Sequence, residues 1–172
     1  METQTTTART ALKFGLIAGV AYIIFTTILY VSGQAANSSL AWISVIIPIT
    51  TMVLAMKEFR TSNGGFLSYG QGLGIGTLMS AISGFISATY SYIYNEFIDP
   101  TLRQQILDKV REDLENRGMD DAQIEQAVEM SQKFSTPGLT FVFGILGAIV
   151  IGFIIALIIS AIMKKDKPFE LE

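Results

Sequence analysis

The stretch Gly64–Phe97, GGFLSYGQGLGIGTLMSAISGFISATYSYIYNEF, decides the fold. It begins in a Gly-Gly turn and contains no Asp, Glu, Lys or Arg between Phe66 and Asn95. At ~1.5 Å per residue, a helix over residues 68–97 is longer than the ~30 Å hydrocarbon core of a bilayer. The stretch therefore predicts a membrane-spanning helix over residues 68–97.

Small residues recur at every fourth position of this stretch, and the last apolar run of the chain repeats the pattern. On a helix with 3.6 residues per turn, this spacing gives a slowly drifting track along which another helix can approach closely. Two such tracks predict either that the two helices pack on each other or that one of them forms the seam of a homodimer. The predicted helix-packing residues are Gly72, Gly76, Ser80, Gly84 and Ala88 in the first track, and Gly144, Ala148, Gly152, Ala156 and Ser160 in the second.

The composition is that of a membrane protein. Half of the 172 residues are hydrophobic, the mean hydropathy is +0.46, and the apolar residues are gathered in long runs. The chain contains no Cys and no His, which excludes thiol nucleophiles, disulfides, His general bases and zinc sites built from these residues. We therefore expect no catalytic residue, no cofactor and no metal site, and we do not expect an enzyme.

Three further apolar runs predict membrane spans. The first run could instead be the core of a signal peptide, because Arg9 and Lys13 precede it, but its length and the spans that follow favour a membrane helix. Pro48 lies in the middle of the second run, where we expect an ordinary kink, with Ser44 helping to satisfy the freed carbonyl. A hinge beside a substrate path is the alternative interpretation of Pro48. The predicted spans cover residues 12–31, 40–56 and 138–163.

Between the third and fourth predicted spans the composition becomes polar, and acidic side chains clearly outnumber basic ones. The pattern predicts an extramembrane helical hairpin over residues 99–135. We expect Asp99 to cap its first helix and Gly118 to end that helix. Asp120 and Gln123 have the spacing of a capping box at the start of the second helix.

Lysine and arginine are concentrated on one side of the resulting four-span arrangement. The positive-inside rule places this side, with both termini, in the cytoplasm, and it places the hairpin outside. The basic residues on this side are Arg9, Lys13, Lys57, Arg60, Lys164, Lys165 and Lys167.

Amide and hydroxyl side chains follow one side of the third predicted span. They could line an aqueous route in an oligomer, or they could bond to a neighbouring helix or to their own backbone. The spans carry no ionisable residue away from their edges, which argues against a single-copy proton-coupled carrier. The candidate polar pathway comprises Gln71, Thr77, Ser83, Ser87 and Ser91.

The order of these features resembles a family of small four-span bacterial membrane proteins known as domain of unknown function 4199. The resemblance rests on the turn Asn63-Gly64-Gly65-Phe66, on Ser68-Tyr69-Gly70-Gln71-Gly72, and on the sequence GMDDAQIE at residues 118–125. It covers roughly Thr10 to Lys165 and implies a bacterial inner-membrane protein with four spans. The family has no assigned activity, so it supplies no catalytic residue.

Taken together, these patterns predict an all-α membrane protein with a single domain over residues 1–172. We expect a structural or partner-binding role. The expected partners are the lipid bilayer and a second copy or another membrane protein, and not nucleic acid. The alternative is a small transporter or channel that forms its pathway by oligomerising. The expected location is the bacterial inner membrane, with both termini in the cytoplasm.

Overall fold

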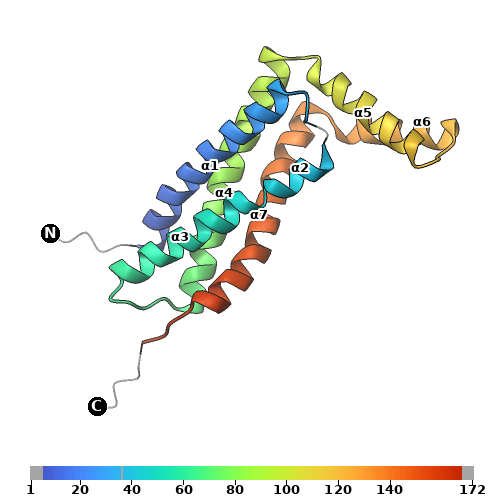
Figure 1. Ribbon diagram of the computed structural model, residues 1–172. Helices are drawn as coiled ribbons and strands as arrows, with labels where there is room; N and C mark the ends of the chain where they lie inside the picture. Colours follow the sequence, from blue (N-terminus) through green and yellow to red (C-terminus); the bar gives the residue numbers. More distant parts are fainter. Residues whose placement is uncertain (1–5, 36, 168–172) are drawn as a thin grey trace, which may run out of the picture.

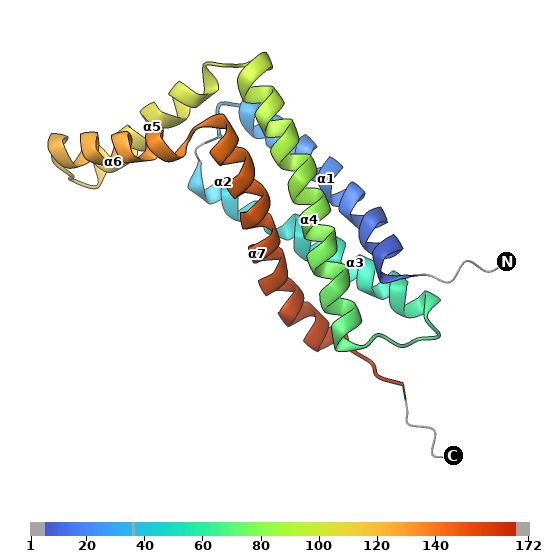
Figure 2. The same ribbon diagram turned by 180° about the vertical axis from the view of Figure 1, so that it is seen from behind.

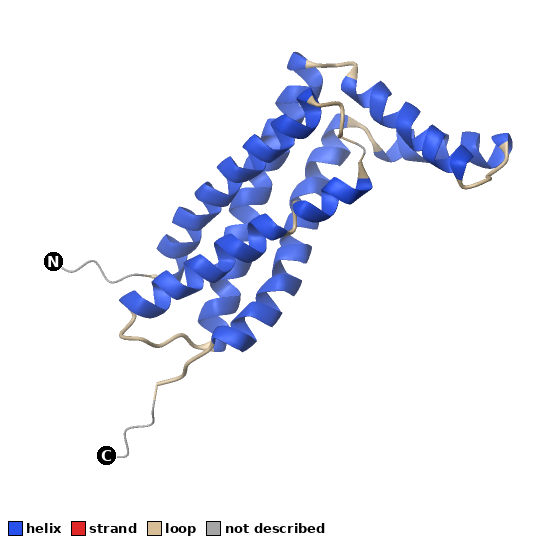
Figure 3. Ribbon diagram, viewed as in Figure 1, coloured by secondary structure: helices blue, strands red, loops and turns tan. Residues whose placement is uncertain are grey.

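The structure is a computed structural model that describes residues 6–35 and 37–167. Within these residues every regular element is a helix, as the all-α prediction requires (Figure 3). The elements are α1 (Thr7–Val31), α2 (Ser38–Ile43), α3 (Ile46–Ser62), α4 (Tyr69–Ile93), the π-helical turn η1 (Tyr94–Ile98), α5 (Leu102–Asn116), α6 (Asp121–Phe134) and α7 (Pro137–Met163).

Among the described residues, three helices are long and apolar enough to cross a membrane. They are α1, α4 continued by η1, and α7. The three lie side by side, and α4 makes the closest contacts with both of the others (Figures 1 and 2). The stretch that decides the fold is thus the central helix of the bundle.

The second predicted span, residues 40–56, is not one helix. A turn at Ser44 and Val45 separates α2 from α3, so the break precedes the expected kink at Pro48. Pro48 lies in the first turn of α3, where the missing N–H would have no partner within the helix. The proline nitrogen cannot bond to the Ser44 carbonyl four residues earlier, and this carbonyl instead accepts from the Tyr22 hydroxyl of α1 at 3.4 Å.

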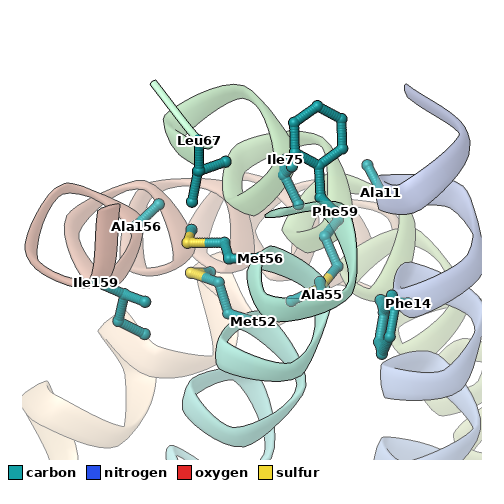
Figure 4. Close-up of a cluster of buried hydrophobic side chains, with 11 residues drawn as sticks. Ala11, Phe14, Met52, Ala55, Met56, Phe59, Leu67, Ile75, Ala156 and Ile159 are labelled. Atoms are coloured by element: carbon teal, nitrogen blue, oxygen red, sulfur yellow. The ribbon is translucent and has the colours of Figure 1, made fainter. Parts of the chain in front are cut away.

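Helix α3 packs on α1, α4 and α7 and builds the hydrophobic core with them (Figure 4). Two contacts reinforce the end of the bundle at which α1 begins and α7 ends. Lys13 Nζ of α1 lies 2.6 Å from Glu58 Oε2 of α3. Leu67 and Lys165 exchange two backbone hydrogen bonds of 2.9 and 2.8 Å, which join the α3–α4 loop to the residues that follow α7. The buried core residues are Ala11, Phe14, Met52, Ala55, Met56, Phe59, Leu67, Ile75, Met79, Ala156 and Ile159.

Helices α5 and α6 pack on each other and lie at the opposite end of the bundle from the start of α1 and the end of α7 (Figure 1). The prediction that Asp99 caps the first helix is wrong, because the N-cap residue of α5 is Thr101. The Asp99 carboxylate instead accepts from the backbone N–H and the hydroxyl of Thr101 and closes a turn ahead of the helix. Gly118 separates the two helices with a φ of 77°. Asp120 and Gln123 form both bonds of the capping box.

Candidate functional site

Helices α4 and α7 pack through their tracks of small residues. A Cβ built on Gly76 would lie 2.5 Å from the Ala156 Cβ, and one built on Gly84 would lie 2.5 Å from the Ala148 Cβ. Real Cβ atoms do not approach so closely, so glycine is what allows this backbone separation. The facing pairs are Gly72–Ser160, Gly76–Ala156, Ser80–Gly152, Gly84–Ala148 and Ala88–Gly144.

A second close contact holds α4 against α1. A Cβ on Gly15 would lie 2.9 Å from the Ile82 Cβ, and one on Gly19 would lie 2.8 Å from Ile86 Cδ1. The central helix is therefore fixed on two faces, by α7 on one and by α1 on the other.

The seam between α4 and α7 opens toward α5 and α6. At the last pair, a Cβ on Gly144 would lie 3.6 Å from the Ala88 Cβ, an ordinary contact distance. Gly138, in the first turn of α7, has no neighbour within 4 Å of such a Cβ. The two helices thus diverge over the part of α7 nearest to α6.

A cavity of about 470 Å³ lies where the helices diverge, bounded by α1, α4, α7 and the α5–α6 pair. Its volume falls within the ~300–1,000 Å³ that is usual for small-molecule sites, and its lining is mostly apolar with a few polar groups, as in such sites. The lining includes Gly84, Ser87, Ala88 and Ser91 of α4, Thr140, Phe141, Gly144 and Ala148 of α7, and Ile106, Leu107 and Val110 of α5.

The polar rim of the cavity is set by the π-helical turn at the end of α4. In η1 the Asp99 N–H donates to the Tyr94 carbonyl at 2.8 Å, five residues back, and such turns are frequent at functional sites. Asn95 and Glu96 lie in this turn and line the cavity, and half-buried Arg103 of α5 joins them.

The five residues of the candidate polar pathway do not form one continuous path, and their side chains have different roles. Gln71 accepts a hydrogen bond from the Ser68 N–H at 2.9 Å, so it caps α4. Thr77 and Ser83 donate to carbonyls of their own helix. Ser87 and Ser91 line the cavity, and Ser91 Oγ accepts from the Tyr30 hydroxyl at 3.3 Å.

Two features of the structure, one at the start of α4 and one at the cavity, were missed by sequence reasoning. Ser68 and Gln71 form a complete capping box, and the S-x-x-Q spacing ahead of an apolar run was the signal that would have found it. Arg103 was not singled out at all. Its place at the cavity depends on the divergence of distant helices, which no local pattern marks.

The apolar faces of α5 and α6 are largely buried. Leu102, Leu107, Ile124 and Val128 are each at most 9% exposed. Among the larger apolar side chains of the pair, Met130 and Phe134 remain well exposed, at 58% and 60%. The pair is thus mainly a self-contained unit that projects from one end of the bundle (Figures 1 and 2), with a small apolar patch left on α6.

Within the described residues the chain is a helical bundle with three membrane-compatible helices and a polar helix pair that projects from one end. A family model described as protein of unknown function (DUF4199) matches residues 13–165. The chain belongs to this family, which confirms the resemblance noted in its sequence. No curated protein and no solved structure matches the chain.

Proposed function

We propose that this protein is a non-enzymatic, multi-pass membrane protein that binds a partner or ligand at the α5–α6 end of its bundle. The observation that carries the proposal is the cavity between the apolar helices and the polar helix pair. A mostly apolar lining with a polar rim suits binding. The lack of Cys and His supports a role other than catalysis.

The proposed topology has four crossings, with α2 and α3 together forming the second. These two helices follow one another along the bundle (Figure 1). Residues 38–62 would reach ~35 Å as helix, which is enough to cross a bilayer even with a break. A short broken helix inside a membrane is tolerated where other helices and side chains satisfy its backbone, as Tyr22 does at Ser44.

The proposed orientation places both termini in the cytoplasm and the α5–α6 pair outside a bacterial inner membrane. Support comes from the basic residues in the first two turns of α1, near the end of α3 and after α7, since these ends gather at one end of the bundle (Figure 2). The opposite end carries the acidic α5–α6 pair.

Cysteine labelling tests this topology, because the natural chain has no Cys. Asn116→Cys places an exposed thiol at the end of α5, and the matched control Ser62→Cys places one at the end of α3. In intact cells a membrane-impermeant thiol reagent is expected to label the first variant only, and lysis should expose the second. Labelling of Ser62→Cys in intact cells, with Asn116→Cys protected, would overturn the orientation.

Transport by an oligomer is the second candidate function. It is favoured by the cavity, which holds the hydroxyls of Ser87 and Ser91. A route through this bundle would have to pass the close contact of Gly84 with Ala148. Labelling of Ser83→Cys, a position that is 3% exposed, would show that water reaches below this contact and would put transport first.

A further inference from the structure

The two charged groups at the rim of the cavity, Glu96 and Arg103, have spare binding capacity. Within the described part of the chain the ion pairs are Lys13–Glu58 and Lys109–Glu112, so neither rim group is in one. The guanidinium of Arg103 offers five N–H donors in a geometry that suits phosphate. The carboxylate of Glu96 offers acceptors to a cationic group. The rim therefore has one positive and one negative group available to a ligand.

The rest of the cavity lining is mostly apolar. Gly84 and Ala88 of α4 meet Ala148 and Gly144 of α7 at contact distance, so these residues close the gap between the two helices and form an apolar floor. A hydrocarbon chain can lie on this floor, beside Ile106, Leu107 and Val110 of α5. Since α4 and α7 are long and apolar enough to cross a membrane, a lipid is a ligand that this surface would meet.

We propose that the cavity binds one zwitterionic phospholipid, of the phosphoethanolamine type. Its phosphate lies at Arg103, its ammonium group at Glu96, and the upper part of an acyl chain lies on the apolar lining of the cavity. The carboxylate disfavours a purely anionic headgroup, which would meet repulsion at Glu96. The rings of Tyr30 and Tyr92, which also line the cavity, favour an ammonium group over a neutral one. This inference rests on the binding role proposed above and names the ligand class.

Native mass spectrometry of the full chain in detergent tests the proposal. The purified protein is titrated with phosphatidylethanolamine or with phosphatidylglycerol, and the retained lipid is counted. We expect one retained phosphatidylethanolamine per chain, bound several-fold more tightly than phosphatidylglycerol. Arg103→Ala is expected to weaken this binding roughly tenfold or more, as for other lost hydrogen bonds to a charged group. The matched control Arg111→Ala, at an exposed position of the same helix outside the cavity lining, should bind like the natural chain.

Two further variants separate the roles of the rim and the apolar lining. Glu96→Gln should reduce the preference for phosphatidylethanolamine over phosphatidylglycerol. Gly144→Leu should strongly weaken retention by placing a branched side chain in the cavity, and its Cβ would lie at an ordinary contact distance of 3.6 Å from the Ala88 Cβ. Circular dichroism of each variant checks that the helices are intact, so that a loss of binding is not a loss of fold.

Several outcomes would overturn the inference. Stronger retention of phosphatidylglycerol would indicate an anion site. Equal retention of both lipids, unchanged in Arg103→Ala and Gly144→Leu, would indicate ordinary lipid around the bundle. Displacement of the lipid by free phosphoethanolamine alone would indicate a soluble ligand. Each of these results can occur while Asn116→Cys is still labelled from outside, so failure here is distinguishable from failure of the proposed topology.

Discussion

Replacing Gly76 by alanine tests whether the close approach of α4 and α7 depends on glycine. The added methyl group would lie 2.5 Å from the Ala156 Cβ and 2.9 Å from the Met52 sulfur. The methionine side chain can move, but the Ala156 methyl group can move only with the backbone of α7. Overpacking of this kind costs ~1–3 kcal/mol of unfolding free energy.

Gly74 provides a matched control two residues away on the same helix. A Cβ built on Gly74 meets no atom within 4 Å, so Gly74→Ala adds no clash. Both substitutions gain the same ~0.5–1 kcal/mol of helix preference for alanine over glycine. The difference between the two variants therefore isolates the packing cost, and it corresponds to a roughly 5- to 150-fold change in the ratio of folded to unfolded protein.

The assay is reversible unfolding in mixed micelles with a rising fraction of denaturing detergent, followed by circular dichroism. Gly76→Ala should unfold at a lower detergent fraction than Gly74→Ala. Adding Ala156→Gly to Gly76→Ala should recover much of the loss, because it removes the clashing methyl group. Equal stability of the two single variants, or no recovery in the double variant, would refute the assignment of this pair to a glycine-dependent contact.

Three further predictions concern local structure, each measured by unfolding of the purified variant. Gly118→Ala should lower the free energy of unfolding of the α5–α6 pair by ~1–2 kcal/mol, because its φ of 77° is strained for alanine, and an unchanged transition would contradict this. Ser68→Ala should cost ~1 kcal/mol through loss of the N-cap of α4, and no change would mean that the capping box adds nothing. Lys13→Gln should cost at most ~1 kcal/mol, because Lys13 and Glu58 are both well exposed, so a large loss would reveal an unexpected role for this pair.

The long helices could be predicted from the sequence because apolar runs of this length have few other solutions. The four-residue spacing of small residues left two arrangements open, and in the structure the tracks of α4 and α7 meet each other. The capping box of α6 was also readable, since Asp120 and Gln123 signal it locally. Each of these features is determined by residues that lie close together in the sequence, within one helix or one repeat.

The break between α2 and α3 and the cavity could not be predicted in the same way. The turn consists of Ser44 and Val45, and neither is a glycine or a proline, the residue types that mark a turn most strongly. The nearby Pro48 predicted a kink at the wrong position. The carbonyl that Pro48 leaves without its usual donor is satisfied by Tyr22, from a helix more than twenty residues earlier. The position of Arg103 likewise depends on how far α4 and α7 separate, which is a property of the assembled bundle.

The repeating seam between α4 and α7 has a geometric consequence for the choice of alignment. Because small residues recur every four positions on both helices, sliding α7 by one repeat, ~6 Å, would again bring small residues opposite one another over most of the seam. The seam alone therefore determines how close the two helices come, but it discriminates poorly between neighbouring alignments. The alignment is instead selected at the two ends of α7. At one end, the backbone of Leu67 is bonded to that of Lys165. At the other end, the connection through α5 and α6 limits the distance between η1 and Pro137.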